Sequence, residues 1–341
     1  MRDLAARLAD YLGARIGRPA KVSGLDRIPG GASRETYRFV LEDPSAGARK
    51  MILRLDPETS LIETHRRIEF AAIRAFMGTE APVPDALWIE EDVGPLGGAF
   101  FVMAEIEGGE TSPMKLTQPP FAAHLAETGR QKWTILGAIA RRDPQTNGFA
   151  ALFAPLREDE CWRRELDHWE RVLDADELEP QPIQRAAIRW MRRNPPPPAQ
   201  RLSIVHGDYR TGNLLVAPGG RIIGVLDWEM AHLGDPLEDL AWSVNRVWNF
   251  ARDERAGGML PKDEAIAIWE RASGLAVDRT ALRWWELLAS LKGQAIWISA
   301  AKEFQTGAAR DSMMAIAAWM QTNSQDRVTL DLLGRLGPKG A

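Results

Sequence analysis

The stretch VHGDYRTGNL, residues 205–214, decides the fold when it is read together with GVLDWE, residues 224–229. In the first stretch an apolar strand leads into a polar loop with Asp208 and Asn213, and a second apolar strand follows. In the second stretch Asp227 comes directly after an apolar strand. Phosphoryl transfer needs such groups, because one carboxylate orients the attacking hydroxyl and oxygen ligands hold Mg²⁺ on the phosphates. The pattern therefore predicts a phosphoryl-transfer centre.

The composition excludes several classes of protein. The chain has 341 residues, 45% of them hydrophobic and 26% charged, which is typical of a globular protein with one or two domains. Its net charge of −4 argues against a protein built to hold the phosphate backbone of nucleic acid. Cys161 is the only cysteine, so an internal disulfide and a cysteine-based zinc site are excluded. No apolar run has the length of a membrane span and no signal-peptide core is visible. We therefore expect a cytoplasmic protein with no nucleic-acid or membrane partner.

Hydrophobic periodicity divides the chain into a strand-rich beginning and a helical remainder. Early strands are predicted at 36–41, 51–55, 86–90 and 99–105, and early helices at 3–16 and 60–77. Later helices are predicted at 121–140, 158–173, 182–193, 235–249, 262–272, 279–304 and 310–322, with a strand at 202–205 and a hairpin at 214–216 and 222–226. We expect an α+β fold with a β-rich lobe at 1–106 and a helical lobe at 107–341 that carries the catalytic loop.

These motifs resemble those of the aminoglycoside phosphotransferase (APH) and choline kinase-like superfamily, whose members are relatives of protein kinases. The pattern H-G-D-x4-N, followed by an apolar strand and D-W-E, carries the resemblance, and GDPLEDLA at 234–241 adds to it. Within the superfamily, the sequence resembles the group related to the kinase domains of acyl-CoA dehydrogenase fusion proteins. The resemblance covers roughly residues 24–320. It implies a bilobal protein-kinase-like fold, with a small antiparallel-sheet lobe that binds nucleotide, and the use of ATP and Mg²⁺.

The resemblance also implies roles for the central residues. Asp208 matches the catalytic aspartate, which orients the substrate hydroxyl or accepts its proton. Asn213 and Asp227 match the metal ligands. His206 matches a scaffold histidine that transfers no proton, and Asp239 resembles the buried aspartate that braces the catalytic loop by hydrogen bonds. The plain alternative is a polar turn with a helix cap, because Asp and Asn favour turns.

Five residues of the first lobe match family positions that bind or support the phosphates. Gly30, Gly31 and Ser33 lie where the family places its phosphate-covering loop, whose backbone N–H groups approach the nucleotide. This segment lacks the G-x-G-x-x-G spacing, so a hairpin turn is the alternative. Arg54 replaces the usual strand lysine with a cation of different reach and geometry. Glu69 matches the glutamate that pairs with this cation, and a solvated helix face is its alternative.

The stretch FVMAEIEG, residues 101–108, resembles the strand that leads into the hinge between the lobes. The backbone near Glu105 and Ile106 is expected to bind the adenine edge, and Met103 to lie at the back of that pocket. A methionine of the ordinary core is the alternative for Met103. For Glu229 two interpretations stay open: contact with a second metal ion or the substrate, or an acid at the start of a helix.

The implied activity is transfer of the ATP γ-phosphate to a hydroxyl of a small molecule, such as a metabolite or a hydroxyacyl compound. The chain has 13 tryptophans, which predict core packing or an acceptor pocket for an apolar alcohol. An aminoglycoside or macrolide kinase is one alternative, although an aminoglycoside pocket should be crowded with carboxylates. A nucleotide-binding pseudokinase scaffold is another alternative, because Arg54 departs from the usual lysine. No pattern in the sequence indicates an oligomeric state.

Overall fold

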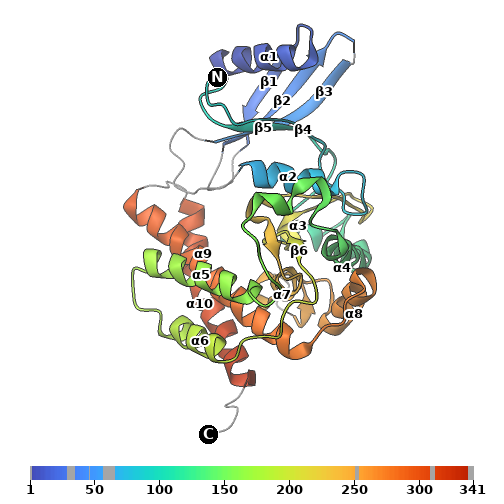
Figure 1. The fold of residues 1–341 in the computed structure, drawn as a ribbon. Coiled ribbons are helices and arrows are strands. Elements are labelled where there is room, and N and C mark those ends of the chain that lie inside the picture. The colour runs from blue at the N-terminus through green and yellow to red at the C-terminus, as the bar shows by residue number, and fades with distance from the viewer. Residues whose placement is uncertain are drawn as a thin grey trace.

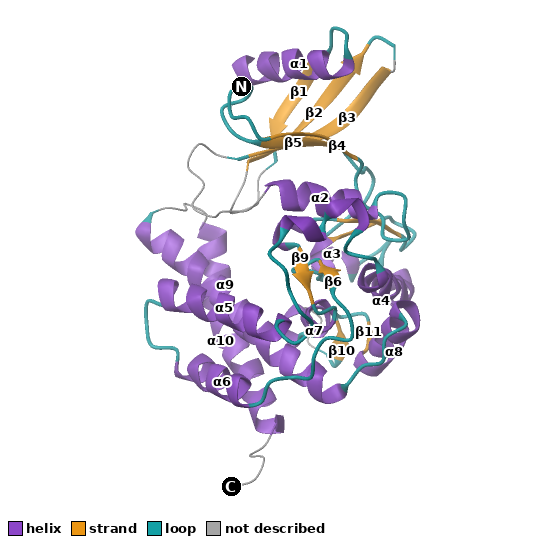
Figure 2. Cartoon of the chain, viewed as in Figure 1, coloured by secondary structure: helices purple, strands orange, loops and turns teal. Residues whose placement is uncertain are grey.

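A computed structural model describes residues 2–28, 35–45, 47–56, 66–249, 253–307 and 312–336. A small lobe based on one sheet lies above a larger helical lobe, with the N-terminus on the first and the C-terminus at the far end of the second (Figure 1). Only short strands lie among the helices of the lower lobe (Figure 2). The chain thus has the bilobal α+β fold that the sequence predicts.

The upper lobe contains a five-stranded antiparallel sheet in the order β1-β2-β3-β5-β4. Side chains alternate along the second strand, so that Phe39 and Leu41 are buried while Arg38 is exposed. Leu8 and Leu12 of the helix α1 pack into the same core and cover one face of the sheet. The elements are α1 (Arg2–Ile16), β1 (Lys21–Arg27), β2 (Glu35–Asp43), β3 (Gly47–Leu55), β4 (Ala86–Glu90) and β5 (Phe100–Ala104).

The helix α2 (Arg66–Phe76) connects the sheet to the helical lobe. Phe70 contacts Phe101 of β5, with ring centroids 5.8 Å apart. At the other end of the helix, Phe76 stacks on Trp228, with ring centroids 4.8 Å apart. All four rings belong to the large core of the lower lobe, so α2 anchors the sheet to that core.

The lower lobe is organised around the 28-residue helix α9 (Arg279–Thr306), whose main helix neighbours among the described residues are α5, α6, α7 and α10. Trp284 and Trp285 on this helix are each only 1% exposed. The other helices are α3 (Pro113–Leu116), α4 (Leu125–Arg141), α5 (Cys161–Asp176), α6 (Pro182–Arg193), α7 (Leu237–Val244), α8 (Lys262–Ser273) and α10 (Ser312–Leu336). The 3₁₀ turns are η1 (Ala122–His124), η2 (Thr146–Gly148), η3 (Ala150–Leu152), η4 (Thr211–Asn213), η5 (Trp228–Met230) and η6 (Arg246–Trp248).

Two strand pairs fix both ends of the segment that contains the central motifs. The strand β6 (Ser203–Val205) pairs with β9 (His232–Gly234), and β7 (Leu214–Val216) pairs with β8 (Ile222–Val225). The first pair therefore fixes the chain just before the loop, and the second pair fixes the chain just after it. The second pair also places the end of the loop beside β8, which leads to Asp227. A third pair joins β10 (Arg255–Ala256) to β11 (Leu260–Pro261).

Several predicted elements differ in extent from the structure. The helix predicted at 60–77 is described only from Arg66, because residues 57–65 lie outside the described part of the chain. The helix predicted at 310–322 is much longer and ends at Leu336, because α10 continues along α9. The strands β1 and β9 and the pair β10–β11 were not expected. β5 ends at Ala104, and the division into domains at residue 106 stays a prediction.

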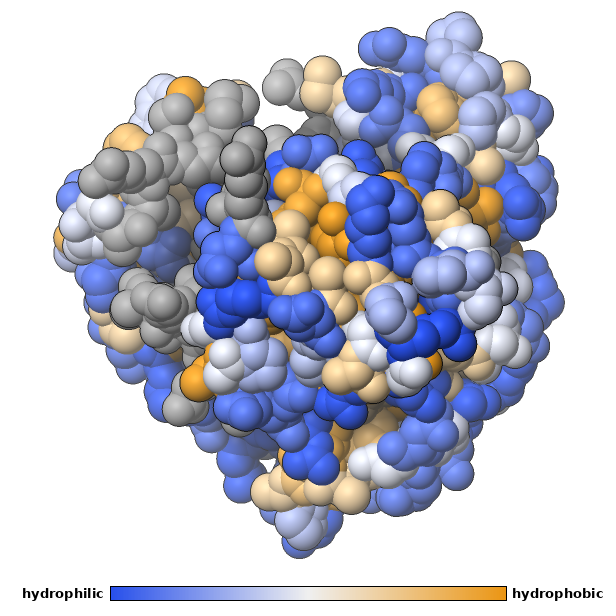
Figure 3. Space-filling view, turned by 90° about the horizontal axis from the view of Figure 1, so that it is seen from above, coloured by the Kyte–Doolittle hydropathy of each residue, from blue (hydrophilic) through white to orange (hydrophobic). Residues whose placement is uncertain are grey.

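Among the described residues, no helix is both long and apolar enough to cross a bilayer. The face seen from above is mainly hydrophilic, with apolar residues gathered towards its centre (Figure 3). Some exposed apolar area is usual for a folded protein.

Candidate active site

The loop that follows β6 depends on a glycine. Gly207 has a φ of +83°, and a Cβ atom at this position would lie 2.3 Å from the carbonyl oxygen of Met230. Only glycine fits, because the left-handed conformation strains other residues and a backbone oxygen cannot easily move aside. Gly207 thus lets the loop pack directly on the segment that follows Asp227.

His206 is buried and its ring makes hydrogen bonds within and beside this loop. Its Nδ1 accepts the backbone N–H of Asp208 at 3.1 Å, and its Nε2 lies 3.0 Å from the carbonyl oxygen of Leu226. Because Nδ1 accepts, the proton is on Nε2 and donates to Leu226. Burial lowers the pKa of His206 from 6.5 to about 4, so the ring is neutral at physiological pH.

The carboxylate of Asp239 braces the loop from α7. Its two oxygens accept the backbone N–H groups of His206 at 2.7 Å and of Gly207 at 2.9 Å. Burial, together with the nearby charge of Glu238, raises the pKa of Asp239 from 3.8 to about 6. The hydrogen bonds that the sequence predicts for Asp239 are therefore present.

The carboxylate of Asp208 is held by three side chains. Its Oδ2 accepts from Asn213 Nδ2 at 2.7 Å, and its Oδ1 accepts from Trp242 Nε1 at 2.8 Å. The Nε of Arg210 lies 3.2 and 3.1 Å from the two oxygens. The side chain keeps 14% of its surface exposed, so a reacting group can reach it. Asp208 is thus a carboxylate that is held in place by its neighbours and is still partly accessible to solvent.

Arg210 and Lys132 are site residues that the sequence did not single out, whereas Trp242 is one of the tryptophans for which it predicts core packing or an acceptor pocket. Nothing in a sequence signals that the indole of Trp242, a helix residue, reaches Asp208. The Nζ of Lys132 is buried and donates to Thr211 Oγ1 at 3.2 Å. Burial and the charge of Arg210 lower the pKa of Lys132 from 10.5 to about 7. Arg210 follows Asp208 by two positions, which is the one local signal that was available.

The hairpin β7–β8 brings Asn213 and Asp227 to the same end of the site. Asn213 precedes β7, and its carbonyl accepts the N–H of Leu226 at 2.9 Å, directly before Asp227. Asp227 has a φ of +65°, a left-handed conformation that non-glycine residues rarely adopt. Strain of this kind persists only where the surroundings impose it, and it gathers at functional sites.

Arg54 joins β3 to one acid on α2 and to two acids that follow β8. Its guanidinium lies 3.1 Å from Glu69 on α2, 3.5 Å from Asp227 and 3.2 Å from Glu229 in η5. The ion pair with Glu69 that the sequence predicts is therefore present. Burial opposes the charge of Arg54, but the three carboxylates outweigh it and raise its pKa. Glu229 lies in the first turn of η5 and also contacts Arg54, so both interpretations of this acid stay open.

This donor set fits a Mg²⁺ ion with nucleotide phosphates. Asn213 Oδ1 has no hydrogen-bond partner among the described residues, and the Asp227 side chain is 35% exposed. Hard oxygen donors of this kind suit Mg²⁺. Arg54 faces three carboxylates, which leaves an excess of negative charge that a divalent cation would balance. The buried Nε of Arg54 has no partner within the described ranges and suits a phosphate oxygen.

The hinge differs in one respect from the expectation. The backbone N–H of Glu105 donates to the carbonyl of Lys50 at 3.0 Å, so it is not available to an adenine ring. The N–H of Ile106 has no partner in the described part of the chain and is the remaining donor. The side chain of Glu105 pairs with Arg38 at 2.6 Å, and Met103 is a half-buried residue of β5. The adenine contacts of Glu105, Ile106 and Met103 stay predictions.

The structure thus gathers most of the predicted residues into one site. The loop residues, the metal-ligand candidates and the pair on β3 and α2 are linked through Asp208, Asn213, Asp227 and Arg54. Gly30, Gly31 and Ser33 lie outside the described residues.

The pKa of His206 predicts how stability depends on pH. Burial lowers it from 6.5 to about 4, so the unfolded chain gains a proton on this ring at higher pH than the native protein. The stabilisation is full above pH 6.5 and is lost as the pH falls towards 4, by about 3 kcal/mol. Urea titrations of wild type and His206→Gln should give unfolding free energies whose difference shrinks across this window. A difference that does not change with pH contradicts the prediction.

Gly207→Ala should destabilise the protein by about 2–4 kcal/mol, because it combines backbone strain with a clash. The added Cβ would lie 2.3 Å from the Met230 oxygen. Gly274→Ala is the matched control, since Gly274 has a φ of +74° but no atom within 4 Å of the added Cβ. It should cost only about 1 kcal/mol. Thermal or urea unfolding measures both, and equal losses would show that the clash is relieved.

Comparison with known proteins gives the family. The model of the phosphotransferase enzyme family (APH) matches residues 24–285. The chain is 26% identical over 233 residues to acyl-CoA dehydrogenase family member 11 of Gallus gallus, which covers 66% of this chain and 28% of that protein. It is 28% identical over 218 residues to acyl-CoA dehydrogenase family member 10 of Mus musculus, covering 62% and 19%. The matched region therefore spans less than a third of these relatives.

Solved structures of similar fold are also phosphotransferases. A presumed aminoglycoside phosphotransferase from Ralstonia eutropha has a TM-score of 0.77 at 21% identity, covering 97% of this chain and 98% of that chain. Macrolide 2′-phosphotransferase type I has a TM-score of 0.61 at 18% identity, covering 93% and 96%. A thermostable mutant of aminoglycoside phosphotransferase APH(4)-Ia, with AMP-PNP and hygromycin B, has a TM-score of 0.58 at 18% identity, covering 95% and 99%. The solved structures agree with this chain in fold. The family model matches most of the chain, so the chain belongs to the phosphotransferase enzyme family.

Proposed function

We propose that the chain transfers the γ-phosphate of ATP to a hydroxyl group of a small molecule, with Mg²⁺ as cofactor. The observation that carries the proposal is the fixed, partly exposed carboxylate of Asp208, bound to Asn213 and close in the fold to Asp227. A kinase needs this combination of one oriented carboxylate and neighbouring oxygen ligands. Nucleotide use is supported by a structural neighbour in complex with AMP-PNP.

In this proposal each residue has a distinct part. Asp208 orients the acceptor hydroxyl and takes its proton as the hydroxyl oxygen bonds to the γ-phosphorus and the bond to ADP breaks. Arg54 steadies the phosphates through its guanidinium. Asn213 Oδ1 and the carboxylate of Asp227 are the metal ligands. Bound Mg²⁺ supplies positive charge that offsets the charge on phosphate oxygens during transfer.

The acceptor that we propose is a metabolite or a hydroxyacyl compound. Arg210 is a partly exposed cation on the catalytic loop, and it would disfavour a polycationic aminoglycoside. The guanidinium of Arg210 lies 5.2 Å from the ring centroid of Trp248, so an aromatic side chain lies next to this cation. The curated relatives are acyl-CoA dehydrogenase family members, which motivates the hydroxyacyl class.

Antibiotic kinase activity is the second candidate function. It is favoured by the fold, since the structural neighbours include macrolide and aminoglycoside phosphotransferases. A phosphorylation screen with ATP and Mg²⁺ separates the candidates if hydroxyacyl compounds, aminoglycosides and macrolides are all offered. Phosphate transfer to an antibiotic alone would overturn the acceptor proposal and leave the reaction class intact.

Asp208→Asn should lower turnover of the acceptor found in that screen by about 10²- to 10⁴-fold, because the amide cannot take the hydroxyl proton. The substitution preserves the size of the side chain and one acceptor oxygen for Trp242, so the fold should persist. Asp331→Asn, on α10, is the matched control, since among the described residues this carboxylate pairs with the surface arginines Arg246 and Arg335. Steady-state kinetics measure the turnover of both variants, and circular dichroism shows whether they are folded. Turnover near wild type in folded Asp208→Asn rejects the proposed function.

Asp227→Asn should raise the Mg²⁺ concentration for half-maximal activity at least about tenfold, because a charged ligand is lost. Asn tolerates the left-handed conformation at this position, so stability should change little. Asp227→Ala should lose the ligand and also about 1 kcal/mol of stability through strain. Magnesium titrations of activity and urea titrations separate the two effects. An unchanged Mg²⁺ requirement in Asp227→Asn removes Asp227 from the metal site.

A further inference from the structure

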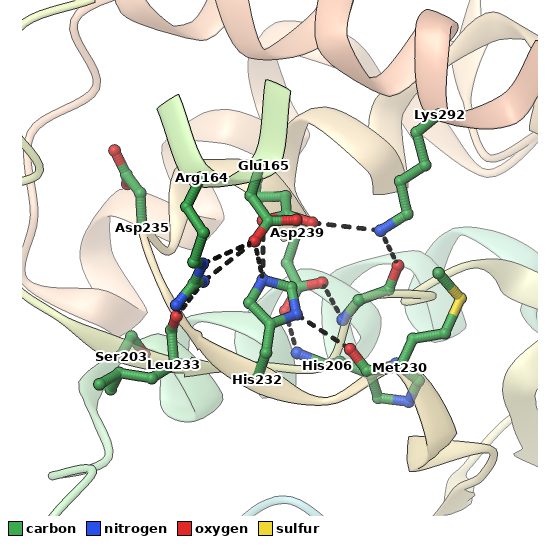
Figure 4. A network of polar contacts seen from close by, with 12 residues as sticks. Arg164, Glu165, Ser203, His206, Met230, His232, Leu233, Asp235, Asp239 and Lys292 are labelled. Carbon is green, nitrogen blue, oxygen red and sulfur yellow. Dashed lines mark hydrogen bonds and ion pairs between the residues drawn. The ribbon is translucent and has the colours of Figure 1, made fainter. Parts of the chain in front are cut away.

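Lys292 of α9 is a buried lysine that neither the sequence motifs nor the proposed reaction uses. Its side chain is 2% exposed, and its Nζ donates to the carbonyl oxygen of Gly207. The same Nζ lies 3.1 Å from Glu238 Oε1 on α7. Figure 4 shows Lys292 reaching from its helix towards the network that contains His206, His232 and Asp239. Burial of an ammonium group costs free energy unless the group is paired, and Lys292 is paired with Glu238 and with the Gly207 carbonyl.

The Gly207 carbonyl belongs to the peptide group that leads into Asp208. Lys292 binds the C=O of this peptide group, while the N–H on its other side, that of Asp208, donates to His206 Nδ1 at 3.1 Å. The carboxylate of Asp239 holds the two preceding N–H groups. The peptide dipole favours a cation beside its carbonyl oxygen and an anion beside its N–H group, and both arrangements are present here. The backbone that carries Asp208 is therefore held by Lys292 on a side that Asp239 and His206 do not reach.

Lys292 also acts on the side chain of Asp208 through Trp242. The Nζ lies 5.0 Å from the ring centroid of Trp242, within the range of a cation–π contact. The indole N–H of Trp242 is the donor at 2.8 Å to Asp208 Oδ1. One buried ammonium thus supports both the backbone and the carboxylate of Asp208.

The charges around Lys292 come from three elements. Glu238 on α7 faces both Lys292 and His232, whose Nε2 is 3.0 Å from Glu238 and 3.5 Å from Glu165 on α5. Burial opposes the charge of His232, but Glu165 and Glu238 outweigh it and raise its pKa to about 9. Arg164 pairs with Glu165 at 3.0 Å. Each carboxylate therefore has a cation, and the network is close to neutral.

The same network contains a geometry that could accept a metal ion. Ligand atoms of Glu165, His232 and Glu238 all lie within 4.8 Å of one another. However, a cation there would face Lys292 and Arg164, which already neutralise the two acids. It would also have to displace a proton that His232 holds strongly. The arrangement favours a closed ion-pair network over a metal site.

We propose that Lys292 is a positioning residue of the phosphotransferase site, which sets the geometry of Asp208 through the Gly207 carbonyl and the Trp242 ring. The inference rests on the proposed function, in which Asp208 receives the acceptor proton. Misplacement of a catalytic group by about 1 Å can cost about 100-fold in rate. Lys292 contacts neither the candidate metal ligands nor Arg54, so its loss acts on turnover and spares nucleotide binding.

The test compares Lys292→Met, Lys292→Arg and Lys302→Met in the full chain. Lys292→Met should lower kcat by about 10- to 100-fold with an unchanged KM for ATP, because only the placement of Asp208 is disturbed. Lys292→Arg keeps a donor for the Gly207 carbonyl and should recover part of kcat. Lys302→Met is the matched control on the same helix, where the lysine pairs with Asp176 at 3.0 Å, away from the loop. It should keep the wild-type kcat.

Amide hydrogen exchange provides a readout that needs no acceptor. Peptides that cover 205–214 should exchange at least about tenfold faster in Lys292→Met, while peptides of β2 and β3 keep their wild-type rates. Should Lys292→Met fail to fold, the double variant Lys292→Met/Glu238→Gln removes the acid left without its lysine and carries the same test. Wild-type kcat with unchanged exchange in the folded variant overturns the inference.

Asp208→Asn in the same assays separates the two proposals. If Asp208→Asn abolishes turnover while Lys292→Met has no effect, the positioning role fails and the proposed function stands. If Asp208→Asn leaves turnover unchanged, the proposed function fails, and with it the rate effect expected for Lys292.

Discussion

The carboxylate of Asp239 accepts two backbone N–H groups, those of His206 and Gly207, in a place where Asp239 itself is 2% exposed. A buried charge left without partners costs about 3–5 kcal/mol, so the loop and α7 have to reach the native state together. The N-terminal turn of α7 adds favourable potential for this acid and for its neighbour Glu238. Consecutive residues on a helix point in different directions. Asp239 therefore faces the loop N–H groups, while Glu238 faces Lys292 and His232.

Arg54 is a second charge that is largely buried and needs partners, and its partners come from both lobes. Its guanidinium meets one acid from α2 and two from the segment after β8, so the sheet and the catalytic segment share one set of charges. Three acids around one cation leave negative charge near the proposed metal ligands, and binding of Mg²⁺ would relieve it. In the proposed function, nucleotide and metal therefore complete an electrostatic balance that the protein alone leaves open.

The parts that could be predicted from sequence are those fixed within a short stretch. The loop, its glycine, the hairpin that returns to Asp227 and the Arg54–Glu69 pair all follow from local pattern or resemblance. Trp242 and Lys292 could not be predicted, because they reach the site from helices that are 34 and 85 residues away in sequence from their partners. The strand β1 was missed because its seven residues, KVSGLDR, contain a glycine and no alternating apolar pattern.

This separation of local and distant groups bears on how one fold serves different acceptors. The proposed chemical groups lie on one loop and one hairpin, whose geometry is set by backbone hydrogen bonds. Two further contacts come from helices: Trp242 of α7 donates to Asp208, and Lys292 of α9 donates to the Gly207 carbonyl. In the proposed function, the surrounding helices can therefore vary without changing the residues proposed as metal ligands. The same physical division explains why the motifs predict the reaction class and carry little information about the acceptor.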